Sequence, residues 1–213
     1  VAIDLPGARG RLFNDVDILV AREALGATEM SLMGAGWVAE ALDPYDVRYY
    51  RRWMHELPPL KHVWRHTWID VHHTIAPPTS RFPIDGQRLL ERTRPLKAGS
   101  RLAVLDGPDM VLHSAAHLLQ EGDFGAGLRD LLDIDDLLRH FGNRPDFWPR
   151  LLDRAGELGL QVPLFHALTQ VQRLFGTEPP AAMRARVDAL VAVEDETAQL
   201  LHDRGVIGAQ QER

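Results

Sequence analysis

The chain contains no cysteine. This absence excludes disulfide bonds, thiolate metal sites and cysteine nucleophiles, and it fits the cytoplasmic location that we predict. No apolar run approaches the roughly 20 residues that a membrane-spanning helix needs, and no signal peptide is recognisable. A basic tract is also missing, since 24 Lys and Arg stand against 30 Asp and Glu, for a net charge of -6. We therefore expect neither nucleic acid nor a membrane as a partner.

The 213 residues do supply the apolar material for a core, because 45% of them are hydrophobic and 25% are charged. These proportions are ordinary for a globular protein, and the length suits one domain or one domain with a small appendage. The chain begins at Val1 rather than Met. We expect a natural N-terminal segment to precede it.

The first half of the chain predicts a small α/β part. The apolar run "NDVDILV" at 14–20 predicts a strand, and the Ala-, Leu- and Met-rich segment 21–37 predicts a helix that ends near Gly34. Aromatic and β-branched residues in 49–75 predict two further strands, joined near Pro58–Pro59. This part extends over residues 1–105.

Residues 106–213 have helical spacing throughout. Pro108 and Asp109 suit a helix start, and Gly142 suits the end of the next helix. In that second helix we expect Asp135 and Asp136 at the surface. Its spacing places five apolar residues mostly on one face: Leu128, Leu131, Leu132, Ile134 and Leu138.

Two acids lie inside the first strand. Side chains alternate along a strand, so Asp15 and Asp17 share one face, while Val16, Ile18 and Val20 point toward the core. Two carboxylates a few ångströms apart repel each other unless they are solvated, protonated or bound to a cation. Mg²⁺ prefers such hard oxygen ligands.

A third acid lies in "WIDVHHTI". Asp70 shares a strand face with His72, and His73 takes the other face. If this strand lies beside the first one, Asp15, Asp17 and Asp70 meet. Three such acids can hold two Mg²⁺ ions, an arrangement that supports phosphoryl transfer.

These motifs resemble one known family. "GARGRLFNDVDILV", then "IDVHH", then "MVLHSAAHLLQEGDFGAGLRDLLDIDDLL" are similar to the uncharacterised nucleotidyltransferase family of the DNA polymerase β-like superfamily. The resemblance covers most of residues 7–140. It implies an α+β fold, with a small mixed sheet flanked by helices and followed by a helical C-terminal region.

The resemblance also implies the chemistry. The family transfers a nucleoside monophosphate from a nucleoside triphosphate such as ATP, with two Mg²⁺ ions as cofactor. Asp15 and Asp17 would bind both metal ions. Asp70 would complete the site and help to deprotonate the acceptor hydroxyl.

The superfamily holds the triphosphate with a Gly-Ser or Gly-Gly turn ahead of the D-x-D strand. No Gly-Ser precedes Asp15, and Gly7 and Gly10 offer a partial substitute. In this family the glycine usually follows a lysine farther upstream. Either that turn lies before Val1, or nucleotide binding is weakened.

Three further side chains are candidates for nucleotide binding. Arg9 and Arg11 lie close to the acidic strand in sequence, and a guanidinium offers a planar donor fork for phosphate oxygens. Both also fit a solvated loop. His72 could orient Asp70 or contact a phosphate.

A downstream helix carries two histidines on one face. His113 and His117 are i, i+4, which suits a metal site, but no H-E-x-x-H motif is present. They equally suit two buried histidines bonded to acids. Asp130 and Asp133 offer such partners. The resemblance implies that these four residues lie near the cleft, where they are candidates for the acceptor pocket.

Three functions compete. The first is an Mg²⁺-dependent nucleotidyltransferase whose acceptor is a hydroxyl of a small molecule, a saccharide or a protein; the resemblance mildly favours a saccharide. The second is a metal-dependent hydrolase with a transition metal held by His72, His73, His113, His117 and Asp123. The third is a non-catalytic partner-binding protein with a degenerate transferase fold.

Overall fold

The computed structural model of the chain describes residues 5, 15–39, 43, 54–120 and 124–190. Four short strands form one sheet in the order β1-β4-β3-β2. They are β1 (Asp15–Leu19), β2 (Trp37–Ala39), β3 (Leu60–His62) and β4 (Trp68–His72). β1 runs parallel to β4, whereas β3 runs antiparallel to both of its neighbours. The sheet is therefore mixed, as predicted.

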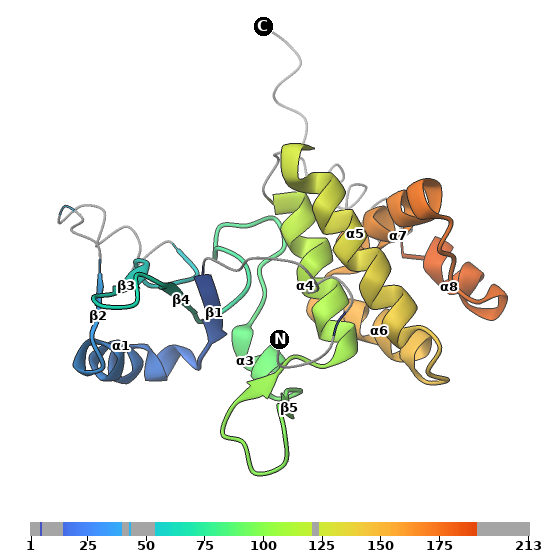
Figure 1. Cartoon of the computed structure of the whole chain (residues 1–213). Helices are drawn as coiled ribbons and strands as arrows, with labels where there is room; N and C mark the ends of the chain where they lie inside the picture. Colours follow the sequence, from blue (N-terminus) through green and yellow to red (C-terminus); the bar gives the residue numbers. More distant parts are fainter. Residues whose placement is uncertain (1–4, 6–14, 40–42, 44–53, 121–123, 191–213) are drawn as a thin grey trace, which may run out of the picture.

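One face of the sheet packs on helix α1 (Leu25–Gly34), which follows β1 through the 3-10 turn η2 (Arg22–Ala24) (Figure 1). Ile18 is partly buried there, as predicted. The expectation that Val16 is a core residue is wrong, because its side chain is 53% exposed. Among the described residues β1 is an edge strand with a neighbour on one side only, so its first residues lack cover.

β3 and β4 are the two strands expected within 49–75, of which residues 49–53 lie outside the described chain. The expected join at Pro58–Pro59 is wrong. The strands are joined by the segment 63–67, and the prolines lie just before β3. Proline has no N–H to donate, so Pro58 and Pro59 interrupt the hydrogen bonding between β3 and the segment 55–57 that precedes them. That segment forms its own hydrogen bonds to β4 and the residue after it.

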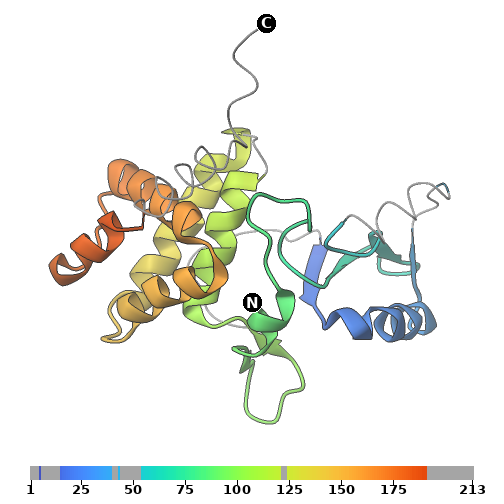
Figure 2. The same ribbon diagram turned by 180° about the vertical axis from the view of Figure 1, so that it is seen from behind.

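A short connecting region follows the sheet. It contains helix α3 (Gly86–Leu90) and a separate two-stranded sheet of β5 (Arg94–Pro95) and β6 (Ala103–Val104). In Figures 1 and 2 α3 lies between β1 and the helices of the second half.

Helix α4 (Gly107–Gln120) is the centre of the helical part. It packs against α5 (Phe124–Phe141), α6 (Phe147–Leu158) and α7 (Gln161–Phe175). The turn η3 (Ala181–Met183) and helix α8 (Arg184–Asp188) complete the described chain. Within the described residues, no helix has the length and apolarity needed to cross a membrane. α4 begins just after the predicted division at 105/106, and the division into two domains stays a prediction.

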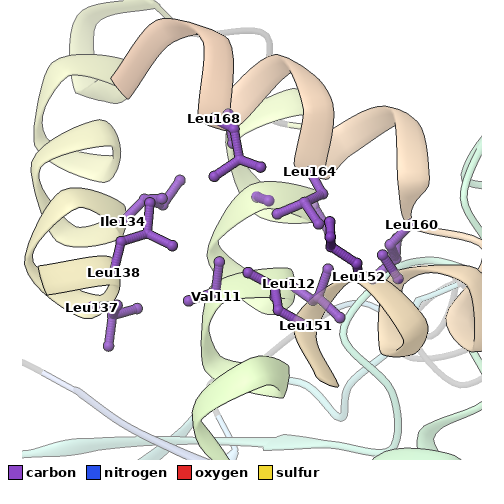
Figure 3. Close-up of a cluster of buried hydrophobic side chains, with 14 of the residues drawn as sticks. Val111, Leu112, Ile134, Leu137, Leu138, Leu151, Leu152, Leu160, Leu164 and Leu168 are labelled. Carbon is purple, nitrogen blue, oxygen red and sulfur yellow. The ribbon is translucent and has the colours of Figure 1, made fainter. Parts of the chain in front are cut away.

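Buried aliphatic side chains from these four helices form the main core (Figure 3). They include Val111, Leu112, Ile134, Leu138, Leu151, Leu164 and Leu168. The predicted apolar face of α5 is narrower than expected, because Leu128 is 60% and Leu132 is 45% exposed. Asp135, expected at the surface, is buried. Its Oδ2 accepts a hydrogen bond from Arg139 Nε at 2.8 Å, which offsets part of the cost of burying the carboxylate, while Oδ1 has no partner among the described residues.

A buried ion pair joins α6 to α4. Arg154 on α6 and Asp109 on α4 are 5% and 1% exposed. Arg154 Nε and Nη2 donate to the two carboxylate oxygens of Asp109 at 2.7 and 3.0 Å. Nη2 also donates to the Arg88 carbonyl oxygen of α3 at 2.6 Å, and Nη1 donates to Glu157 at 2.8 Å. One guanidinium therefore ties three helices together.

We expect Arg154→Met to lower the free energy of unfolding by about 3–5 kcal/mol, because it leaves the Asp109 charge buried without its partner. The matched control is Arg186→Met. Arg186 donates to Asp153 at 2.6 Å on the surface, and such pairs contribute about 0–1 kcal/mol. Urea denaturation of both variants measures the difference. Equal losses in the two variants would contradict the role given to the buried pair.

Candidate active site

The three aspartates meet on one face of the sheet. Asp17 of β1 is paired in register with Asp70 of β4, and Asp15 lies two residues before Asp17. Side chains of paired residues in parallel strands project from the same face, and adjacent strands are about 4.8 Å apart. The structure therefore brings Asp15, Asp17 and Asp70 together, as the sequence spacing predicted.

The carboxyl group of Asp70 has an unsatisfied oxygen. Its Oδ1 is buried and has no hydrogen-bond partner among the described residues. Burial raises the pKa of Asp70 above its ordinary value, and the negative charge of Asp17 raises it further. An orphaned carboxylate oxygen beside two more carboxylates is a suitable donor set for Mg²⁺, which prefers oxygen ligands. The residues present thus fit the divalent ion that the fold implies.

His72 connects this acidic face to a second acid. Its Nε2 donates to Asp17 Oδ1 at 3.0 Å, and its Nδ1 lies 3.3 Å from Glu56 Oε2. The hydrogen bond from His72 lowers the pKa of Asp17 and keeps that carboxyl group ionised. Burial disfavours the charged form of His72, but the bond to Asp17 and the charge of Glu56 outweigh it, so the pKa of His72 is raised.

Sequence analysis missed Glu56 and His55. Glu56 forms an isolated antiparallel bridge with His72, and the rings of His55 and His72 stack with centroids 5.2 Å apart. Burial lowers the pKa of His55 to about 4, helped by the neighbouring histidines. The sequence predicts a strand before Pro58, but only the pairing of this segment with β4 reveals which strand it joins.

The rings of His113 and His117 lie beside each other on α4, with centroids 6.3 Å apart. When protonated, His113 and His117 lower the pKa of Asp17. His117 Nδ1 lies 3.6 Å from Asp130 Oδ2 on α5, so the expected acid partner of His117 is present. Asp133 is partly buried on the same helix.

Several candidate residues are not placed at this face by the described part of the chain. Gly7, Arg9, Gly10 and Arg11 lie outside the described residues, as does Asp123 of the hydrolase alternative. His73, the next residue after β4, lines a separate cleft rather than the acidic face. The ligand set of the hydrolase alternative is therefore not assembled in the part of the chain that the structure describes.

The cleft that His73 lines was also missed. It has a volume of about 650 Å³, within the range of small-molecule sites. Its polar lining comes from the start of η2, the end of β4 and the start of α3, and includes Arg22, Glu23, His73, Asp85 and Gln87. At Gly86 an added Cβ would come 1.9 Å from the His73 carbonyl oxygen, so only glycine permits this close approach of α3 to β4.

Three carboxylates on two adjacent parallel strands of an α+β fold are typical of enzymes that transfer a phosphorus-containing group with divalent metal ions. The model of the uncharacterised nucleotidyltransferase family matches residues 1–176. The chain belongs to this family, whose general function is nucleotidyl transfer. The match extends past the predicted span of 7–140 and includes α6 and α7. No curated protein and no solved structure matches the chain significantly.

His113 makes the stability of the fold dependent on pH. Burial lowers the pKa of His113 from 6.5 to about 4, so between these values the unfolded chain binds more protons than the folded one. Stability is therefore lost as the pH falls below 6.5. We expect the free energy of unfolding of His113→Gln to fall less than that of wild type between pH 7 and pH 5, by up to about 2 kcal/mol.

Urea denaturation at several pH values measures this effect. The matched control is His166→Gln, which changes an exposed histidine on α7. The same pH slope in wild type and His113→Gln would show that His113 does not carry the effect.

Proposed function

We propose that this protein is an Mg²⁺-dependent nucleotidyltransferase that moves a nucleoside monophosphate from a nucleoside triphosphate to a hydroxyl group of an acceptor. The observation that carries the proposal is the in-register pairing of Asp17 with Asp70. This pairing brings the two carboxylates together, and Oδ1 of Asp70 has no hydrogen-bond partner among the described residues. Such a cluster of carboxylates favours the binding of a cation. Family membership supports the same chemistry.

In this proposal Asp15, Asp17 and Asp70 hold the metal ions. Two Mg²⁺ ions bound there would stabilise the attacking and leaving oxygens of an in-line displacement. The acceptor oxygen forms a bond to the α-phosphorus, the bond from that phosphorus to the bridging oxygen breaks, and pyrophosphate leaves. The raised pKa of Asp70 suits it to take the proton of the acceptor hydroxyl.

His72 acts on this chemistry through Asp17. Its Nε2–H occupies Asp17 Oδ1, so one carboxylate oxygen is held in a fixed direction while the other is left for a cation. Gly7, Arg9, Gly10 and Arg11 are the proposed contacts for the triphosphate, for which ATP is the first nucleotide to test.

The proposed acceptor pocket is the surface of α4 and α5 that carries His113, His117, Asp130 and Asp133. This proposal is supported by the effect of protonated His113 and His117 on the pKa of Asp17 and by the pair between His117 and Asp130. These groups offer hydrogen-bond donors and acceptors that suit a hydroxyl-rich molecule, and a saccharide is the acceptor class that we favour.

We expect Asp70→Asn to lower the rate of transfer by about 10²–10⁴-fold, because an amide cannot accept the proton of the acceptor hydroxyl. Asp17→Asn should abolish Mg²⁺-dependent nucleotide binding, because it removes a negative ligand at constant volume. Both variants should fold, since they relieve repulsion. The measurement is transfer of label from α-labelled nucleoside triphosphates into cell-extract acceptors, with nucleotide affinity measured separately by calorimetry.

The matched control is Asp153→Asn, which neutralises an exposed carboxylate on α6. It should transfer at the wild-type rate. Native transfer by Asp17→Asn would refute the metal-binding role of the aspartates. Wild-type protein that binds no nucleotide with Mg²⁺ would favour a non-catalytic, partner-binding role instead.

A further inference from the structure

We propose that His55, Glu56 and His72 form a binding site for a divalent transition-metal ion of the Zn²⁺ type, separate from the three aspartates. One ligand atom from each residue lies within 4.8 Å of the others. This site goes beyond the proposed transfer reaction, because it takes a different kind of metal ion and because two of its three ligands, His55 and Glu56, have no part in that reaction.

The spacing of the donor atoms already approaches that of a metal centre. Ligands at about 2.0–2.2 Å from a tetrahedral zinc ion lie about 3.4 Å from one another. His72 Nδ1 and Glu56 Oε2 are 3.3 Å apart. A ligand nitrogen of His55 lies within 4.8 Å of these two atoms and would have to move closer to them to bind the same ion. The His55 ring already stacks on the His72 ring, with an interplanar angle of 30°.

Backbone hydrogen bonds fix all three residues before any ion binds. His73 N donates to His55 O at 2.9 Å, and Leu57 N donates to Val71 O at 2.9 Å. Glu56 lies between these two bonds, opposite His72. The ligands therefore sit on a strand and its paired segment rather than on a loose loop, which lowers the entropic cost of assembling the site.

His55 has a nitrogen without a hydrogen-bond partner. Its Nδ1 is buried and unpartnered among the described residues. A buried ring nitrogen normally finds a partner, and a bound cation would satisfy its lone pair.

The hydrogen bond that His72 makes through Nε2 is typical of a histidine that binds a metal ion through Nδ1. Ligating histidines usually donate their second N–H to a carboxylate, which fixes the tautomer and the ring orientation. His72 Nε2 donates to Asp17 Oδ1 at 3.0 Å, and Nδ1 lies 3.3 Å from Glu56 Oε2, so a bound ion would take the place of a proton between Nδ1 and Glu56. A metal at this site would lock His72 and, through it, the Asp17 carboxylate.

The donor set selects the class of ion. Two imidazoles and one carboxylate suit Zn²⁺, Fe²⁺ or Co²⁺, whereas Mg²⁺ prefers oxygen ligands throughout. Three protein ligands also leave a coordination position for water or substrate. The region would then hold two chemically different kinds of metal, Mg²⁺ on the aspartates and a transition metal one histidine away.

The test uses the full chain, dialysed free of metal and kept in excess Mg²⁺ to fill oxygen-only sites. We expect one Zn²⁺ per chain by elemental analysis, and Co²⁺ should give the absorption bands of a four- or five-coordinate ion. His55→Ala and Glu56→Gln should each weaken Zn²⁺ binding at least about tenfold, since even outer partners of metal sites contribute 10–100-fold. Glu56→Gln keeps the side-chain volume and decides the test if His55→Ala fails to fold.

Two matched controls separate this site from its surroundings. His166→Ala removes an exposed histidine on α7, and Asp15→Asn removes charge from the acidic face; both should retain the Zn²⁺. The proposal is overturned if wild type binds no Zn²⁺ in excess Mg²⁺, if His55→Ala and Glu56→Gln bind it as wild type does, or if Asp15→Asn alone releases it. Because the readout is bound metal without nucleotide, it stands or falls independently of transferase activity.

Discussion

The site depends on one constraint, the parallel pairing of β1 with β4 in a register that sets Asp17 opposite Asp70. A shift of one residue would turn the β4 side chains to the opposite face and separate the carboxylates. The register is held by the apolar residues on the other face, where Ile18 packs with Ile69 and Val71 above α1. Hydrophobic burial on one side of the sheet thus enforces electrostatic repulsion on the other, and the hydrogen bond from His72 to Asp17 relieves part of it.

Much of this face could be predicted from the sequence. Strand periodicity of two was enough to place Asp15 with Asp17 and Asp70 with His72, because both segments are apolar and contain no internal proline. The order of helices after Pro108 also followed from spacing. The family resemblance supplied the mixed sheet and the adjacency of two strands that are about fifty residues apart in the chain.

Other features depend on tertiary contacts that no local pattern encodes. Glu56 and His55 reach the site because their segment pairs with β4, although two prolines separate it from β3. Asp135 is buried, where it pairs with Arg139, whereas Leu132 on the same helix is exposed. The helices that pack against α5 decide which of its faces is buried, and the composition of α5 alone does not. Val16 is exposed because β1 lies at a sheet edge.

The guanidinium of Arg154 has a mechanical consequence for the cleft beside β4. It bonds the backbone of α3 at Arg88 to α4 and α6, so the α3 wall of the cleft belongs to the helical bundle. The opposite wall, at His73, continues from the sheet. The cleft therefore lies between the end of the sheet and a helix that is tied to the bundle, so a ligand held there would contact both.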